Sequence, residues 1–133
     1  KHAEDGAPIY AECGGLMYLT KSISFGKKRY KMVGLFDAET HMSKKMTLNY
    51  TEGRIRSNCI VSAPAKFRAH EFHYSKILNL PRDAKLVYDL KIGEGIANKK
   101  DALSEYNTLA SYCHLYFDSS KYASNLLNFR PKF

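Results

Sequence analysis

One cysteine lies where a nucleophile is expected. Cys13 follows a short apolar segment, residues 8–11, and is followed directly by Gly14 and Gly15. This order predicts a strand, a sharp glycine turn and then a helix. Such a turn projects its side chain into a cleft, and the free N–H groups of a helix N-terminus lower a thiol pKa and stabilise an oxyanion. We predict Cys13 as the nucleophile and the Gly14 N–H as an oxyanion donor; the alternative is a buried structural cysteine.

A thiol nucleophile needs a base within hydrogen-bond reach, and a histidine distant in sequence is the usual supplier. His114 stands among apolar and aromatic residues near the end of a predicted strand. We predict it as the base of Cys13. Taken alone, the same pattern also fits a core histidine whose hydrogen bonds are satisfied.

A third polar cluster lies at residues 70–75. On a strand, Glu71 and His73 share one face, while His70, Phe72 and Tyr74 share the other. We expect Glu71 and His73 to line the cleft and His70 to face elsewhere. A zinc site is disfavoured because a second closely spaced ligand pair is lacking, so no metal ligand is predicted.

The elements that must position these residues indicate one α/β domain with a mixed sheet and flanking helices. We expect the first elements of the domain to be missing, because the sequence opens on the nucleophile strand. The predicted elements are a helix end at 1–7, strands at 8–11, 32–36, 67–74, 85–92 and 109–117, a hairpin of 47–50 and 54–60 around a Glu52-Gly53 turn, a turn at 93–95, and helices from Leu16 and over 119–129.

Composition sets broad limits on the function. The 133 residues contain 44% hydrophobic residues and carry a net charge of +8. Basic residues gather at 27–31, 44–45 and 99–100, which indicates a solvated surface more than a nucleic-acid site. The second interpretation is that these residues attract an anionic molecule or an acidic partner. Neither a long apolar run nor a leader is visible. Three cysteines, an odd number, favour reduced thiols and a cytoplasmic location.

Together these segments resemble the glutaminase domain of the cobyrinic acid a,c-diamide synthase family, a class I glutamine amidotransferase domain of cobalamin biosynthesis. The resemblance runs from about residue 6 to residue 117 and implies a flavodoxin-like fold. It is carried by residues 8–19 around Cys13, residues 70–75, residues 109–115 with His114, and the pattern Gly93-x-Gly95-Ile96 followed by Asp101 and Leu103.

The resemblance implies a mechanism. Cys13 attacks the carboxamide of glutamine, forms a glutamyl thioester and releases ammonia, with His114 as base. An ATP-binding synthetase domain, expected upstream, activates two carboxylates of a bound tetrapyrrole with ATP and Mg²⁺, and ammonia converts them to amides. Residues 1–133 are thus expected to be a partial amidotransferase domain without a cofactor of its own. Its expected partners are glutamine, the synthetase domain and the tetrapyrrole, with no nucleic acid and no membrane.

Some features depart from the family pattern. The loop that carries the second oxyanion donor is expected upstream of Lys1, so we expect the isolated chain to show no diamide synthesis and little glutaminase turnover. Tyr116 stands where related enzymes carry a histidine or the glutamate of a triad, which favours a Cys–His dyad. The alternatives are a Ni-sirohydrochlorin a,c-diamide synthase, a non-catalytic fragment that docks on a partner domain, or a free-standing cysteine hydrolase.

Overall fold

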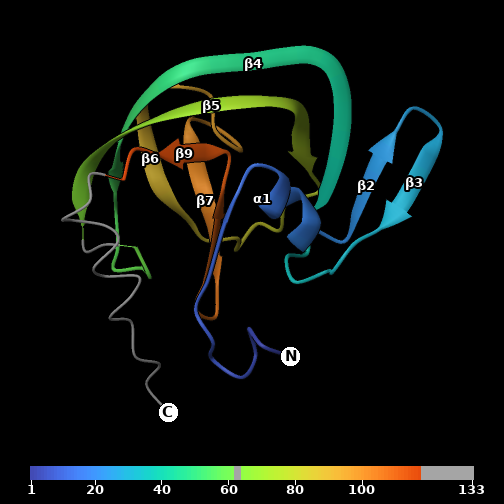
Figure 1. Ribbon diagram of the computed structural model, residues 1–133, viewed down its shortest axis with the longest axis horizontal. Helices are drawn as coiled ribbons and strands as arrows, with labels where there is room; N and C mark the ends of the chain where they lie inside the picture. The colour runs from blue at the N-terminus through green and yellow to red at the C-terminus, as the bar shows by residue number, and fades with distance from the viewer. Residues whose placement is uncertain (62–63, 118–133) are drawn as a thin grey trace.

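The computed structural model describes residues 1–61 and 64–117 (Figure 1). The helix expected over 119–129 lies outside the described residues. The elements, in chain order, are β1 (Ile9–Glu12), α1 (Gly14–Leu19), β2 (Ser22–Phe25), β3 (Lys28–Lys31), β4 (Glu39–Ile55), β5 (Ala65–Leu78), β6 (Leu86–Ile92), β7 (Lys100–Glu105), β8 (Thr108–Ser111) and β9 (Cys113–Leu115).

The strands form one mixed sheet, as the sequence predicts. Its main path runs β1-β8-β7-β6-β4-β2-β3, and β5 pairs with both β4 and β9. The β1–β8 and β2–β4 pairs are parallel, whereas the other pairs are antiparallel. In Figure 1 the long strands β4 and β5 arch side by side over the region that holds α1, β7 and β9. This arch brings the middle of β5 close to the segment that begins with α1.

The alternation of β5 places its polar residues inside. Alternate side chains from Phe67 to Ile77 are buried, and this buried row includes Glu71, His73 and Ser75. Two apolar clusters lie on either side of these polar residues. One packs β4, β5, β6 and β9 around Tyr88, and the other packs α1 against β7 and β8 around Leu16. Buried polar groups need hydrogen-bond partners, so the polar side chains in this buried row of β5 must form hydrogen bonds with neighbouring segments.

The predicted hairpin around Glu52-Gly53 is wrong. Residues 39–55 form the single strand β4, and both residues pair within it, with Arg68 and Phe67 of β5. A side-chain carbon at Gly53 would lie 2.6 Å from the carbonyl oxygen of Asp89 and 2.7 Å from the Phe67 ring. Glycine is therefore present here because β6 and an aromatic ring approach the backbone closely, and not because the chain turns.

Three further predictions need correction. Residues 1–7 form hydrogen-bonded turns and not the end of a helix. Residues 32–36 form no strand: their backbone N–H groups donate to the segment from Tyr18 to Lys21, and Val33 is 52% exposed. The segment 109–117 is not one strand, because it divides at Tyr112 into β8 and β9. The strand at 85–92 and the turn at 93–95 are confirmed, with positive φ at Gly93 and Gly95.

Candidate active site

Cys13 occupies a strained turn between β1 and α1. Its φ is 49° and its ψ is −104°, a region that residues with a side chain rarely adopt. The backbone N–H of Cys13 donates to the carbonyl of Ser111 at 2.8 Å, and its carbonyl accepts from Met17 at 3.1 Å. Strain of this kind costs on the order of 1–3 kcal/mol and gathers at functional sites. The geometry is that of a nucleophile elbow.

The two glycines after Cys13 have different surroundings. A side-chain carbon built on Gly14 would meet no atom within 4 Å, so space beside its backbone is open. A side-chain carbon on Gly15 would lie 2.9 Å from the Cβ of Ala11. Gly15 therefore lets α1 pack closely on β1, while Gly14 leaves room for a ligand beside its backbone.

The thiol of Cys13 is not activated by the helix alone. Burial raises its pKa above the ordinary value, the charge of Glu12 adds to this, and the backbone N–H of Gly14 opposes them. A helix N-terminus is expected to lower the pKa of the thiol, but the net direction is the opposite, because partial burial outweighs the single N–H contact. Sγ donates to the carbonyl of Phe72 at 3.5 Å. A protonated thiol of this kind requires a base to become a nucleophile.

His114 lies on β9, beside β5. In the antiparallel register it pairs with His70, and the two rings stack with centroids 4.7 Å apart. His70 therefore shares a face with His114 and does not point elsewhere as the sequence argument expects. The Nδ1 atom of His114 lies 3.7 Å from a carboxylate oxygen of Glu12. Its Nε2 atom is buried and has no hydrogen-bond partner among the residues that the structure describes.

Glu12 lies beside His114 and was not predicted from the sequence as a candidate site residue. It ends β1, and its Oε1 atom accepts a hydrogen bond from the backbone N–H of Leu115 at 3.0 Å. The hydroxyl of Tyr10 donates to the same oxygen. Burial raises the pKa of Tyr10 well above its ordinary value, so this hydroxyl stays protonated as a donor. The available signal was the strand period of two, which places Tyr10 and Glu12 on one face directly before Cys13.

Glu71 and His73 are buried on the other face of β5. Glu71 accepts hydrogen bonds from the backbone N–H groups of Glu94, at 2.6 Å, and Gly95, at 3.0 Å. The ring of His73 stacks on Tyr112 with centroids 3.6 Å apart. These contacts hold β5 to the 93–95 turn and to the break between β8 and β9. That either side chain lines a cleft remains a prediction.

Cys13 and His114 are connected through residues that are close to their contacts in the chain, and not through a residue that touches both. Glu12, next to Cys13 in the chain, lies beside His114 and bonds to Leu115. The thiol of Cys13 contacts Phe72, two residues from the histidine that stacks on His114. No hydrogen bond joins the thiol to His114 within residues 1–61 and 64–117. Direct contact between nucleophile and base remains a prediction, and hydrogen bonds of this kind often tighten only when substrate binds.

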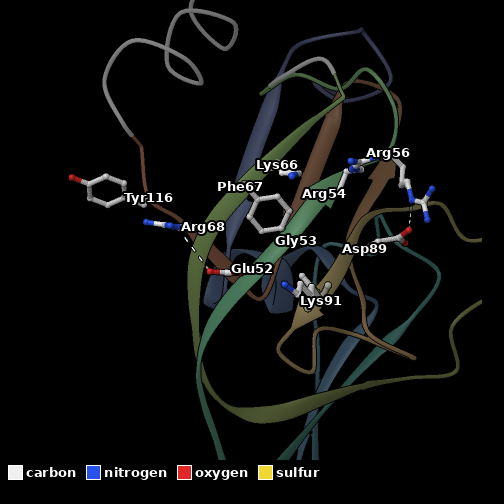
Figure 2. A pocket seen from close by; sticks show the side chains of 11 residues that line it. Glu52, Gly53, Arg54, Arg56, Lys66, Phe67, Arg68, Asp89, Lys91 and Tyr116 are labelled. Carbon is white, nitrogen blue, oxygen red and sulfur yellow. Dashed lines mark hydrogen bonds and ion pairs between the residues drawn. The ribbon is translucent and has the colours of Figure 1, made fainter.

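A pocket of about 900 Å³ lies elsewhere, over β4, β5 and β6 (Figure 2). Two of its arginines are already paired, Arg56 with Asp89 and Arg68 with Glu52. Cys13 and His114 are not among the described residues that line it, so we place the candidate site at the elbow. Its described lining is mainly basic and polar: Glu52, Gly53, Arg54, Arg56, Lys66, Phe67, Arg68, Asp89, Leu90, Lys91 and Tyr116.

Within residues 1–61 and 64–117, no group of three or more histidine, cysteine or acidic residues is arranged to hold a metal ion. In the same residues, no helix has the length and apolar character needed to cross a bilayer.

Comparison with known proteins gives a consistent result. Residues 1–122 match the family described as the CobB/CobQ-like glutamine amidotransferase domain. The cobyrinate a,c-diamide synthase of Sulfurisphaera tokodaii is 48% identical over 122 residues, covering 91% of this chain and 28% of that protein. The corresponding protein of Saccharolobus solfataricus is 43% identical over 116 residues, covering 86% of this chain and 26% of that protein.

A third relative, the cobyrinate a,c-diamide synthase of Methanosarcina barkeri, is 39% identical over 130 residues and covers 87% of this chain and 26% of that protein. The chain thus spans between 26% and 28% of the length of these three curated relatives. The family match covers most of the chain, and the mixed sheet with its elbow agrees with it. The chain belongs to the CobB/CobQ-like glutamine amidotransferase domain family.

Proposed function

We propose that this chain is the glutamine-hydrolysing part of an ATP-dependent cobyrinate a,c-diamide synthase, and that Cys13 is its nucleophile. The observation that carries the proposal is the backbone of Cys13, held at φ 49° on the turn between β1 and α1, next to Glu12, whose carboxylate lies 3.7 Å from Nδ1 of His114. The named function of the relatives supports the choice of reaction.

The proposed reaction has two halves. His114 takes the proton of the Cys13 thiol, and the thiolate attacks the carboxamide carbon of glutamine. The C–N bond of the tetrahedral intermediate breaks, and the nitrogen leaves as ammonia with the proton that His114 returns. Water, activated by the same imidazole, then hydrolyses the thioester to glutamate and restores the thiol.

The oxyanion formed in both halves needs hydrogen-bond donors. The backbone N–H of Gly14 is the proposed donor on this chain, because it follows the nucleophile and the space beside its backbone is open. Removing one oxyanion donor costs on the order of 100- to 1,000-fold in rate in other acyl-transfer enzymes. Gly14 is therefore proposed as a contributor to the rate and not only as a turn residue.

The ammonia is proposed to reach a synthetase domain that belongs to the complete enzyme. That domain would bind ATP and Mg²⁺ and activate the a and c carboxylates of cobyrinate as phosphates. Ammonia would displace each phosphate to form an amide. This assignment agrees with the relatives, in which the matched region is 28% of the chain or less. We propose a cytoplasmic location for the whole enzyme.

The test is chemical labelling of the complete enzyme with the glutamine analogue diazo-oxo-norleucine. We expect the label on Cys13 before Cys59 or Cys113, because Cys113 is buried and its thiol pKa is raised by burial and by Asp101. Cys13→Ala is expected to abolish glutamine-dependent amidation and to preserve amidation from free ammonium. Peptide mapping that places the label mainly on Cys59 would overturn the proposal, as would glutamine-dependent turnover by the Cys13→Ala enzyme.

A further inference from the structure

Glu12 is held in a fixed orientation at the end of β1. Its side chain is 24% exposed, and its two oxygens have different partners. Oε1 accepts from the backbone N–H of Leu115 at 3.0 Å and from the hydroxyl of Tyr10. Oε2 is directed toward Nδ1 of His114 at 3.7 Å. The two donors on Oε1 therefore fix the carboxylate so that its other oxygen faces the imidazole.

The two nitrogens of His114 have complementary environments. Nδ1 faces a carboxylate, which favours the tautomer that carries the proton on Nδ1. Nε2 is buried without a hydrogen-bond partner among the described residues. With the proton on Nδ1, the lone pair on Nε2 is the one available to take a proton from a thiol. The stacked ring of His70 limits rotation of the imidazole about this position.

We infer that Glu12 is a positioning residue that orients His114 and keeps its proton on Nδ1, so that Nε2 acts as the base for Cys13. This inference rests on the proposed glutaminase function. The present separation of 3.7 Å between Oε2 and Nδ1 exceeds the length of a hydrogen bond, so the inference requires the two atoms to approach by about 0.8 Å when substrate binds. The imidazolium that forms during the reaction is then stabilised by the carboxylate, as in other base–carboxylate pairs.

Glu12→Gln separates orientation from charge. The introduced carboxamide keeps an oxygen that accepts from Leu115 and Tyr10, and it turns an NH₂ group toward Nδ1 of His114. An NH₂ donor that faces Nδ1 favours the tautomer with the proton on Nε2. In that tautomer Nε2 has no lone pair with which to accept the thiol proton. In serine proteases the corresponding change lowers kcat by about 10⁴. Because Glu12 is partly exposed and not yet at bonding distance, we expect a loss of at least about 100-fold in kcat.

The experiment uses the complete enzyme and four variants: Glu12→Gln, Glu12→Asp, Glu39→Gln and Cys13→Ala. Glu39→Gln is the matched control, because Glu39 is also a strand carboxylate paired with a cation, Arg29, and its side chain is 27% exposed. Glutamate release gives kcat and KM for glutamine, and amide formation from free ammonium reports the rest of the enzyme. Nitrogen NMR of the His114 ring, at a pH where it is neutral, reports which nitrogen carries the proton.

We expect Glu12→Gln to lower kcat with KM changed less than threefold, to preserve ammonium-dependent synthesis and to move the His114 proton to Nε2. Glu12→Asp is expected to keep the proton on Nδ1 with an intermediate kcat. Wild-type kcat and an unchanged tautomer in Glu12→Gln would overturn the inference and leave the proposed function standing. Glutamine turnover by Cys13→Ala would instead overturn the proposed function. If Glu12→Gln fails to fold, the tautomer in Glu12→Asp decides: a proton on Nε2 there overturns the inference.

Discussion

Changing Glu71 to glutamine removes one buried charge from the centre of β5 with little change in volume. The Glu71 side chain is fully buried, and its oxygens accept from the backbone N–H groups of Glu94 and Gly95 and from the side-chain amide of Asn49 at 2.8 Å. A carboxamide offers one acceptor oxygen in place of two. Its NH₂ group must face a backbone N–H that now lacks an acceptor. We therefore expect Glu71→Gln to destabilise the protein.

The size of the loss follows from the titration of Glu71. Burial alone raises the pKa of this carboxyl, but hydrogen bonds from His73, Asn49 and the two backbone N–H groups lower it to about 2, against an ordinary 4.5. This difference corresponds to roughly 3 kcal/mol of stabilisation at neutral pH. We expect Glu71→Gln to lower the free energy of unfolding by about that amount, measured by urea denaturation at pH 7.

The pH dependence gives a second measurement with a defined sign. Because the pKa of Glu71 is lowered in the folded state, its contribution is complete above pH 4.5 and is lost as the pH falls from 4.5 to about 2. The difference in unfolding free energy between wild type and Glu71→Gln should therefore shrink over that range. Glu52→Gln is the control, because Glu52 is 45% exposed and lies 4.0 Å from Arg68; its effect should stay within about 0.5 kcal/mol. A loss below 1 kcal/mol at pH 7, or a loss independent of pH, refutes the reasoning.

Two further changes test how the elbow and the base-bearing strand are held. Gly15→Ala places a methyl group 2.9 Å from the Cβ of Ala11, so α1 must shift. We expect this change to lower the free energy of unfolding by about 1–3 kcal/mol and to slow the alkylation of Cys13. Gly14→Ala is the control, because the space beside Gly14 is open and no steric loss of stability is expected. Asp101→Ala removes the acceptor of the backbone N–H groups of residues 112 and 113, at 3.1 and 2.7 Å, and should cost at least about 2 kcal/mol, with faster hydrogen exchange at both amides. Unchanged exchange at those amides would contradict this role for Asp101.

Local sequence patterns were sufficient where one face of an element is plainly buried. The alternation across residues 67–74 predicted β5, and the apolar segment before Cys13 predicted β1 and the elbow. These predictions succeeded because the alternation of a strand and the effect of a glycine pair are decided by a few consecutive residues. They also placed Glu71 and His73 on one face of the strand, which is the buried one.

Local patterns failed where a distant contact decides the conformation. Gly53 was predicted as a turn residue. Glycine is needed there because Asp89 and Phe67 approach the backbone of β4 from two other strands. The break at Tyr112 was not visible either, because it depends on Asp101, whose carboxylate accepts the N–H of Tyr112 and of the residue after it. Glu12 was missed for the same reason: besides Tyr10, its partners Leu115 and His114 belong to the distant strand β9.

The segment that joins β8 to β9 contacts Cys13 and carries His114, the two residues of the proposed dyad. The carbonyl of Ser111, the last residue of β8, accepts the N–H of Cys13 and so holds the elbow. The chain then turns at Tyr112, where Asp101 binds the backbone, and enters β9 with His114. A shift of this segment would move the support of Cys13 and the ring of His114 at the same time. Burial raises the pKa of Asp101, so its carboxylate is held there at an electrostatic cost, which the hydrogen bonds from the N–H groups of Tyr112 and Cys113 offset.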